Sequence, residues 1–321
     1  MTFIAMIDRY YNKKPNLVVL FKAGKLFDYP LNVPEYRESY FDLFKVASKE
    51  FSVFVVRGVK VHWRQGIFKS GYYFTHSHFQ VWPKKIAAKV VYDKNVDELF
   101  AAKTNRDWSM INQFGLKKIC YNKHLTYLTF PQFHKFTCQF FDKKGALRCL
   151  KKIKTDQVVY KPIYGLGGRG IIIGRPKIVL RKLKNFNQGL FQEFIDTSAG
   201  ITGICPSYHD LRAIIMDGRI VQSYVRIPKS GSLVANVAQG GTLKEISKES
   251  LPTSVLKIIK QVDLIFKKFG HRVYAVDFGL EKDQPYLMEI NRAPGMPFKK
   301  EKYYHQYHRD LLKVFKAALK N

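Results

Sequence analysis

The sequence predicts an α+β protein in which an N-terminal α/β domain precedes a larger region of antiparallel hairpins and amphipathic helices. Three observations support this prediction. β-Branched runs at 17–21 and 51–61 enclose a segment with helical spacing, turn signals separate short strands in the second half, and apolar residues recur at i, i+3, i+4 and i+7 along 254–270. We therefore divide the chain into an N-terminal domain, 1–100, and a C-terminal domain, 101–321.

The N-terminal domain alternates between predicted strands and helices. LVVLF (17–21) and FSVFVVRGVKV (51–61) are rich in residues that strands favour, and SYFDLFKVASKEF (39–51) spaces its aromatic residues as a helix does. The segment 101–115 is predicted to be a helix that Gly115 ends, because glycine commonly follows the last turn of a helix.

The C-terminal domain is punctuated by glycine-rich turns. Asp217 and Gly218 form a strong hairpin signal, and Gly270 follows a lysine-rich helix as a stop signal. We expect a lid subdomain at about 116–188 and a C-terminal subdomain at about 189–321. The predicted elements are a hairpin of strands 157–163 and 171–174 joined by the turn 164–170, a strand at 189–195, a hairpin at 211–227, a helix at 254–270, strands at 272–280 and 285–291, and a helix at about 303–320.

The composition rules out several classes of protein. The 321 residues are 46% hydrophobic and 15% aromatic, ample for a packed core despite a net charge of +30, so an intrinsically disordered chain is excluded. Cys120, Cys138, Cys149 and Cys205 lie too far apart for a CxxC metal-ligand pair and are too few for a disulfide scaffold. A reducing interior is therefore the default expectation.

The N-terminal stretch MTFIAMIDRYYNKK is interrupted by Asp8 and lacks the basic segment of a signal peptide. No run approaches the roughly 20 apolar residues of a membrane span. These features predict a soluble, cytoplasmic protein with no membrane partner. The 55 Lys and Arg residues, against 25 Asp and Glu, are compatible with an anionic partner, but a general excess of lysine along the chain explains them slightly better. We therefore predict no specific nucleic-acid ligand.

A glycine-rich turn directly follows a strand that ends near Lys161. The segment 165–170 matches GxGxxG, but it leads into IIIG, a poor start for the helix that a dinucleotide fingerprint needs. Lys161 precedes the glycines, the reverse of the order in protein kinases, and the Walker pattern is absent. Two interpretations remain: an ordinary flexible hairpin, or a loop whose N–H groups, together with Lys161, close over the phosphates of a nucleotide.

Two carboxylates and an amide lie on the last two predicted strands. Asp277 belongs to YAVDFG, while Glu289 and Asn291 are two residues apart in YLMEIN and therefore share a face. If the two strands pair, their oxygen atoms converge as ligands suited to Mg²⁺ and phosphate. The alternative is that these residues are simply solvated strand ends, which their position in an otherwise apolar run disfavours.

Taken together, these segments resemble the ATP-grasp superfamily from about residue 100 to 298. The chain presents, in order, YKPIYGLGGRGI, FQEFI, HDLR, SYVRIPK, ANVAQGG, VDFG and LMEINRAPG. It is most similar to the ribosomal-protein glutamate ligase type, with glutathione synthetase and D-alanine–D-alanine ligase more distant. Their joint order over about two thirds of the chain is specific, although each motif is weak by itself. The resemblance implies an α+β ATP-grasp fold behind an N-terminal α/β pre-ATP-grasp domain.

The resemblance also implies a role for each matched residue. It implies that ATP is bound by a strand lysine, lid glycines, hinge residues and an acid at the ribose, namely Lys161, Gly165, Gly167, Gly168, Gly170, Glu193, Phe194 and Asp210. It implies catalytic residues near the γ-phosphate, the acyl phosphate or the incoming carboxylate, namely Arg226, Arg212 and Asn236. It implies two Mg²⁺ ions, replaceable by Mn²⁺, at Asp277, Glu289 and Asn291. The competing interpretation makes the arginines surface charges and Asp210 a turn residue.

The family usually has a further nucleotide-binding lysine on the helix before the lid, often in a DK pair. In this chain the helix reads AAKTNRDW, which makes Lys103 the best candidate, with the YDK at 92–94 as its rival. The histidines show neither HxxxH nor HExxH spacing, so we predict no zinc site and interpret them as surface or core residues.

The implied chemistry is ATP-dependent ligation of a carboxylate to an amine through an acyl phosphate, with release of ADP and phosphate. The acid and the amine are expected to be small molecules or peptides, and the positive field favours an acidic one. A homodimer is common in such families. The alternative is a non-catalytic ATP-binding or nucleic-acid-binding protein on the same fold, against which the intact set of two acids and an amide argues.

Overall fold

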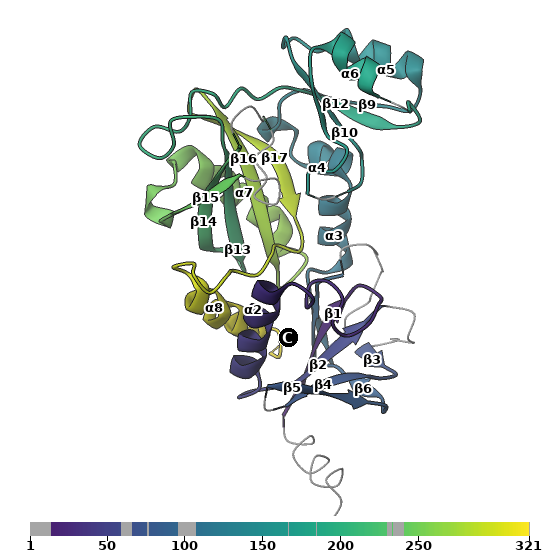
Figure 1. The fold of residues 1–321 in the computed structure, drawn as a ribbon, viewed down its shortest axis with the longest axis vertical. Helices are drawn as coiled ribbons and strands as arrows, with labels where there is room; N and C mark the ends of the chain where they lie inside the picture. Colours follow the sequence, from purple (N-terminus) through teal and green to yellow (C-terminus); the bar gives the residue numbers. More distant parts are fainter. Residues whose placement is uncertain are drawn as a thin grey trace, which may run out of the picture.

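The computed structural model describes residues 14–58, 66–75, 77–95, 107–165, 167–183, 185–229, 233 and 241–320. These residues form three sheets of four or more strands, with helices packed against them (Figure 1). The predicted α+β class is confirmed. Among these residues, no helix combines the length and the apolar character needed to cross a membrane.

The N-terminal sheet has six strands in the order β5-β4-β2-β1-β7-β8. β1 pairs in parallel with β2 and β7, and β7 with β8, while β4 and β5 add an antiparallel edge. The two predicted strands and the helix between them are confirmed, but the helix spans 34–47 rather than 39–51. The elements are β1 (Asn16–Phe21), α2 (Pro34–Ala47), β2 (Ser52–Arg57), β4 (Gly71–Thr75), β5 (His78–Trp82), β7 (Val90–Asp93) and β8 (Ser109–Ile111), with β3 (Ile67–Phe68) and β6 (Ile86–Ala87) as a separate pair.

The helix predicted at 101–115 is wrong where the structure describes it. Its first six residues lie outside the described residues, and Ser109–Ile111 form an edge strand of the N-terminal sheet. A helix, α3 (Phe114–Tyr121), begins beside Gly115 instead of ending there. A Cβ atom on Gly115 would lie 2.1 Å from the Phe269 ring. The glycine therefore allows α3 to pack closely, and it does not act as a helix stop.

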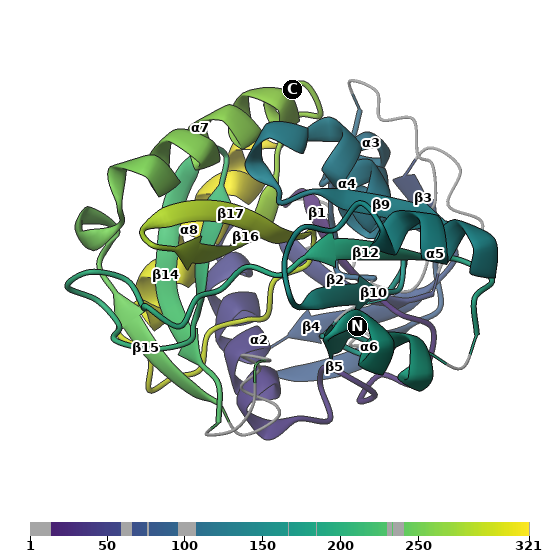
Figure 2. The ribbon, with the colours of Figure 1, turned by 90° about the horizontal axis from the view of Figure 1, so that it is seen from above.

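We call the segment from β9 to β12 the lid, which is a four-stranded antiparallel sheet in the order β11-β10-β12-β9. Two helices, α5 and α6, pack on one face through Ala146, Cys149 and Val179, which meet Phe140 and Phe191 of the sheet (Figure 1 and Figure 2). The predicted hairpin around the glycine loop is confirmed as β10 paired with β11. Two elements precede the lid, α4 (Lys123–Thr129) and η2 (Pro131–Phe133). The elements of the lid are β9 (Thr137–Phe140), α5 (Lys143–Leu150), β10 (Val158–Lys161), β11 (Ile172–Gly174), α6 (Pro176–Lys182) and β12 (Gly189–Glu193).

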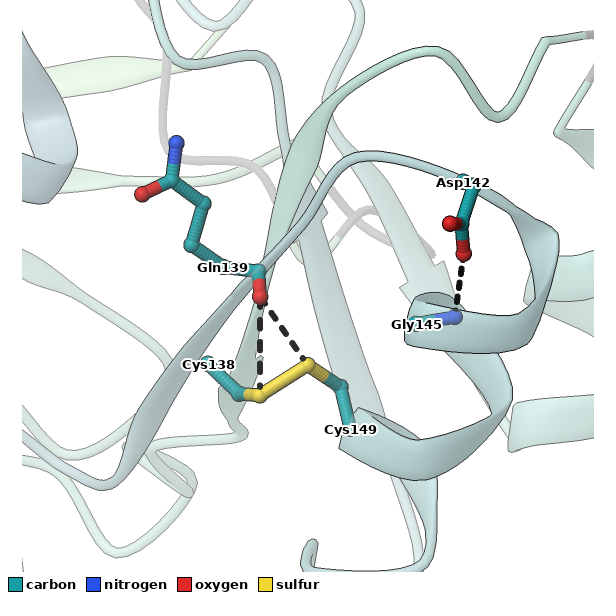
Figure 3. Close-up of a disulfide and its surroundings, with 5 residues drawn as sticks. All are labelled: Cys138, Gln139, Asp142, Gly145 and Cys149. Carbon is teal, nitrogen blue, oxygen red and sulfur yellow. Dashed lines mark hydrogen bonds between the residues drawn. A yellow bond between two sulfur atoms is a disulfide. The ribbon is translucent and has the colours of Figure 1, made fainter.

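A disulfide bond joins Cys138 on β9 to Cys149 on α5 (Figure 3). The two cysteines are 11 positions apart, in a strand and a helix, so no short cysteine motif reveals the pair. Cys120 and Cys205 are buried free thiols. From the sequence we expected a reducing environment, in which cysteines stay unpaired, and this bond does not fit that expectation. The bond fastens α5 to the sheet.

The C-terminal sheet has five antiparallel strands in the order β15-β14-β13-β16-β17. The turn between β13 and β14 has positive φ at Asp217 (46°) and Gly218 (81°), so the predicted hairpin is confirmed. The predicted helix and the two strands after it are also confirmed, with α7 on one face of the sheet and α8 on the other. The elements are β13 (Asp210–Met216), β14 (Arg219–Ile227), β15 (Thr242–Ile246), η4 (Lys248–Ser250), α7 (Thr253–Lys267), β16 (Val273–Glu281), β17 (Gln284–Asn291) and α8 (Tyr304–Ala317).

One hydrophobic core joins the N-terminal and C-terminal sheets. α2 packs against α8 (Figure 1), and a single cluster of buried side chains combines Leu17 and Tyr92 of the N-terminal sheet with Ile214 and Val273 of the C-terminal sheet. Each of these four side chains is almost fully buried. The two sheets therefore share apolar interior across the predicted domain boundary.

Polar side chains fasten the loop after β17 to the N-terminal sheet. Lys94 Nζ donates a hydrogen bond to the Pro294 carbonyl, and Arg292 donates to the Asn95 carbonyl at 2.9 Å. Asn112 Nδ2 donates to the Arg292 carbonyl at 2.6 Å. This loop begins directly after Asn291, so residues of the N-terminal sheet help to position the end of β17.

Candidate active site

The candidate active site lies between α4, β17 and the face of the lid sheet that points away from α5 and α6. Thr137, Lys161 and Gln192 of the lid and Glu289 of β17 line this space. The space holds about 20 Å³, about the room of one water molecule. The lid and β17 therefore lie close together in this structure.

Lys161 ends β10 and is buried beneath the lid. Its Nζ atom donates to the Met288 carbonyl at 3.2 Å, next to Glu289 in the chain. Burial lowers the pKa of Lys161 to about 8, and the charge of Glu289 opposes this shift. A phosphate group placed in the same space would likewise favour the charged ammonium.

The loop after Lys161 has a backbone that only glycine adopts easily. Gly165, Gly167, Gly168 and Gly170 have φ values of 119°, 68°, 73° and 76°. An added Cβ atom on Gly165 or Gly167 would meet nothing within 4 Å. At Gly165 and Gly167, backbone conformation and not crowding therefore accounts for the glycine, as expected of a loop that must bring its N–H groups close to a ligand. At Gly170 an added Cβ atom would also lie 3.0 Å from Pro162.

Glu193 is the last residue of β12, and Phe194 follows it. The Glu193 N–H donates to the Phe136 carbonyl at 3.0 Å, and its Oε1 atom accepts from the Lys154 N–H at 2.9 Å. The Phe194 N–H donates to Thr155 Oγ1 at 3.2 Å. Because both N–H groups are used within the protein, a contact with adenine at these two residues falls to their carbonyl groups or needs a local rearrangement.

Asp277 is held by two arginines and by Asn291. On β16 it lies opposite Arg212 of β13 and opposite Glu289 of β17. Arg212 donates to both carboxylate oxygens at 2.5 Å, while Arg226 and Asn291 donate to Oδ2 at 3.0 and 3.1 Å. Burial disfavours the charged form of Asp277, but the two arginines outweigh it and lower its pKa.

The pairing of β16 with β17 brings the three predicted metal ligands together. Asp277 faces Glu289 across the strands and is hydrogen-bonded to Asn291. Oδ2 of Asp277 already accepts three hydrogen bonds, so Oδ1 has the spare capacity. With the Glu289 carboxylate and the Asn291 amide, these are hard oxygen donors of the kind that Mg²⁺ prefers. Within the described ranges, no group of three or more His, Cys, Asp or Glu side chains could hold a metal by itself, so ligand phosphates would have to complete the site.

Asp210 begins β13 and faces Arg226 on β14. Arg226 donates to Asp210 Oδ2, yet burial raises the pKa of Asp210 to about 7. The Oδ1 atom is buried and accepts no hydrogen bond from the part of the chain that the structure describes. Asp210 thus belongs to the arginine cluster and keeps one unused acceptor.

Lys123 also lies in the site, although it is not among the residues predicted from the sequence. It is the first residue of α4, and Asn122 caps this helix by accepting a hydrogen bond from the Leu125 N–H at 3.0 Å. Lys123 Nζ donates to the Gly165 carbonyl at 2.6 Å and lies 3.7 Å from Glu289 Oε1. The signal that could have found it is the Asn122-Lys123 pair, which is similar to the DK pair expected before the lid.

Two of the predicted site residues, Lys103 and Asn236, lie outside the described residues. Lys94, the rival of Lys103, bonds to Pro294 at the junction of the two sheets and does not line the site. Burial lowers the pKa of Lys94 to about 7. His134 does line the site, and burial lowers its pKa to about 3, so its ring is neutral near pH 7.

The sequence matches a known family and several known proteins. A model described as the RimK-like ATP-grasp domain matches residues 138–309. A probable alpha-L-glutamate ligase of Shewanella halifaxensis (strain HAW-EB4) is 29% identical over 145 residues, which are 43% of this chain and 28% of that protein. Another, from Rhodopirellula baltica (strain DSM 10527 / NCIMB 13988 / SH1), is 24% identical over 160 residues, 48% of this chain and 36% of that protein. The matched stretch thus spans only about a third of the length of these relatives.

Solved structures share the fold at low sequence identity. D-alanyl-alanine synthetase A from Vibrio cholerae O1 biovar eltor str. N16961 has a TM-score of 0.63 at 11% identity, covering 95% of this chain and 98% of that one. D-cycloserine synthetase DcsG has a TM-score of 0.60 at 11% identity, covering 92% and 99%. The predicted ATP-grasp fold is confirmed. Since the RimK-like model spans more than half of the sequence, the chain belongs to the RimK-like ATP-grasp family.

Proposed function

We propose that this protein is an ATP-dependent ligase that joins a carboxylate to an amine. The observation that carries the proposal is that Lys161, Lys123 and Glu289 line one small space. Asp277 lies opposite Glu289 on the neighbouring strand and is hydrogen-bonded to Asn291. Lys123 connects both sides, because it bonds to Gly165 of the loop and lies 3.7 Å from Glu289. Membership of the RimK-like ATP-grasp family and the printed names of the relatives, which are ligases, support the same class.

The lid and the hinge bind the nucleotide. Lys161 and Lys123 place positive charge at the phosphates, where hydrogen bonds between charged groups are strong. The N–H groups of the glycine loop donate to the phosphoryl group that is transferred. The remaining contacts are those of Glu193 and Phe194 with adenine and of Asp210, through its unused oxygen, with the ribose hydroxyls.

The reaction runs in two steps. The substrate carboxylate attacks the γ-phosphorus, the bond from that phosphorus to the β,γ-bridging oxygen breaks, and ADP leaves beside an acyl phosphate. The amine then attacks the acyl carbon, the carbon–oxygen bond to phosphate breaks, and the amine nitrogen loses a proton to give the amide. Arg226 stabilises negative charge on the transferred phosphoryl group, and Arg212 holds the incoming carboxylate.

Asp277, Glu289 and Asn291 would hold two Mg²⁺ ions, or Mn²⁺ in their place, together with the nucleotide phosphates. Bound there, such ions neutralise negative charge on the phosphates. The two arginines that now neutralise Asp277 lie beside these ligands, so the chain keeps positive charge at the position of phosphoryl transfer.

We propose an acidic amino acid or an acidic peptide as one substrate, because a net charge of +30 attracts anions to the site. A role of Asn236 near the phosphates, a homodimer and a cytoplasmic location remain predictions from the sequence. The non-catalytic alternative is disfavoured by the assembled set of Asp277, Glu289 and Asn291.

Substrate-dependent release of ADP tests the function. The protein is incubated with Mg-ATP and with pairs of acids and amines drawn from amino acids, small acids and peptides, and the products are identified by mass spectrometry. We expect ADP release that requires both partners and a product whose mass is the sum of the two minus water. ATP binding without ADP release for any pair would contradict the ligase proposal.

Adding Mg-ATP is expected to slow amide hydrogen exchange in residues 164–170, because their N–H groups then donate to phosphate oxygens. Hydrogen exchange followed by mass spectrometry measures this protection peptide by peptide. The turn at Asp217 and Gly218, at the far end of β13, serves as the internal control and should be unaffected. Equal exchange of the loop with and without nucleotide would count against a phosphate-binding lid.

Lys123→Ala is expected to weaken ATP binding about tenfold or more, whereas Lys103→Ala should have little effect. Lys123 reaches both Gly165 and Glu289, and a hydrogen bond to a charged group contributes about 1.5–3 kcal/mol. Calorimetric titration with a non-hydrolysable ATP analogue measures both dissociation constants. A larger loss of ATP affinity in Lys103→Ala than in Lys123→Ala would indicate that Lys103 is the nucleotide-binding lysine before the lid.

A further inference from the structure

The positive charge of the chain is concentrated in the lid. Between residues 138 and 188 the sequence has thirteen Lys and Arg residues but only two acids, Asp142 and Asp156. The ratio is about three times that of the whole chain, which has 55 Lys and Arg against 25 Asp and Glu. An even spread of lysine, as first expected from the sequence, does not describe this segment.

Many of these cations lie on one surface. α5 and α6 cover the face of the lid sheet that is opposite Lys161, and they bury their apolar sides against it (Figure 1 and Figure 2). Their outer sides are exposed and cationic. We call this surface the lid basic face, made up of Lys143, Lys144 and Arg148 on α5 and of Lys177, Arg181 and Lys182 on α6.

The lid basic face is not neutralised by the protein. None of its six cations has an ion-pair partner among the residues that the structure describes. Lysines elsewhere do pair, as Lys299 does with Glu38 and Lys313 with Asp310, both at 2.8 Å or less. Six like charges without acids between them repel one another, and an extended polyanion would relieve that repulsion.

The nearby acid does not offset this charge fully. Asp142 is the N-cap of α5, and its Oδ1 atom accepts a hydrogen bond from the Gly145 N–H (Figure 3). Its carboxylate is thereby turned to the first turn of its own helix. Three apolar side chains are also exposed beside the cations, Phe141 at 64%, Leu147 at 42% and Ile178 at 37%.

We propose that the lid basic face binds the phosphate backbone of a single-stranded nucleic acid, without sequence preference. A surface rich in cations across two helices suits the regularly repeated negative charges of such a strand. Phe141 offers an aromatic ring on which an unpaired base can stack. The proposal is independent of the ligase reaction.

The position of the lid basic face favours a nucleic acid over an acidic peptide substrate. A substrate of the proposed reaction must reach Lys161 and Glu289, which lie on the other side of the lid sheet. A membrane surface is disfavoured because α5 and α6 direct their apolar sides to the lid core, whereas helices that lie in a membrane interface insert an apolar stripe.

Fluorescence anisotropy with a 20-nucleotide single-stranded RNA tests the proposal at 50 and 200 mM salt. If four phosphates are neutralised, the affinity falls about 50-fold between these two salt concentrations. The test variant carries Lys143→Gln, Lys144→Gln and Lys177→Gln. The matched control carries Lys257→Gln, Lys260→Gln and Lys267→Gln on the exposed side of α7, so both variants lose three positive charges.

The lid variant is expected to bind at least about tenfold more weakly at 50 mM salt, with a shallower salt dependence, while the control keeps most of the affinity. Phe141→Ala should weaken binding of the single strand more than binding of a duplex of the same length. Equal losses in the two triple variants, or no RNA binding at 50 mM salt, would overturn the proposal. It would also be overturned if polyglutamate or anionic vesicles displaced the RNA at a lower concentration of charge than competitor RNA does.

Discussion

Glu289→Gln and Asn291→Ala are each expected to lower the Mg²⁺-dependent rate of ADP release about 10²–10³-fold or more, while the protein stays folded. Each change removes an oxygen ligand from the point where Asp277 and β17 meet. Neither side chain is fully buried, so neither change empties core volume. Steady-state ADP release at saturating Mg²⁺ measures the loss, and circular dichroism together with thermal unfolding checks the fold.

Asp283→Asn is the matched control for Glu289→Gln, because both change a carboxylate to an amide. Asp283 lies in the turn between β16 and β17, where its carboxylate accepts hydrogen bonds from Thr202. Its φ of 62° is one that Asn tolerates well. Near-normal ADP release is expected. If Asp283→Asn were as inactive as Glu289→Gln, the metal-ligand assignment would be wrong.

Lys161→Ala is expected to raise the dissociation constant for ATP about 10- to 100-fold and to slow phosphoryl transfer. Lys161 is only 8% exposed, and a charge in such a dry space interacts more strongly with phosphate than a surface charge does. Titration with a non-hydrolysable ATP analogue measures binding, and rapid-quench analysis of ADP formation measures the transfer step.

The pH dependence provides a further readout for Lys161. Its pKa of about 8 means that the ammonium loses its proton as the pH rises through 8, so the ATP affinity of the unaltered protein should fall between pH 7 and 9. Lys161→Ala should show a smaller fall over that range. Lys152→Ala, which removes an exposed lysine just after the end of α5, should match the unaltered protein in both affinity and pH profile. A fall of the same size in Lys161→Ala would assign the titration to another group.

Local sequence signals predicted those parts of the site that depend on neighbouring residues. Asp217 and Gly218 predicted the hairpin of β13 and β14, whose pairing places Asp210 opposite Arg226. The two-residue spacing of Glu289 and Asn291 predicted a shared face, and the pairing of β16 with β17 then brought both to Asp277. In these cases a turn or an alternation of side chains, encoded over a few residues, determines the geometry.

Features that depend on contacts between distant segments were not predictable in this way. In the sequence, Gly115 resembles a helix stop. In the structure, the absence of a side chain at Gly115 leaves room for the ring of Phe269, which is more than 150 positions away in the sequence. Lys123 could be assigned to the site only when the lid loop and β17 were seen beside α4. The bond between Cys138 and Cys149 likewise needs the packing of α5 on β9.

The interior shared by α2, α8 and the two sheets has a consequence for protein engineering. A fragment that begins at residue 101 would uncover Ile214 and Val273 and would leave Arg292 without the Asn95 carbonyl. Newly exposed apolar surface of this kind promotes aggregation. The N-terminal third is therefore not a detachable module. Grafting it between relatives, for example to change substrate choice, would require compensating substitutions in α8 and along the faces of β13 and β16 that meet it.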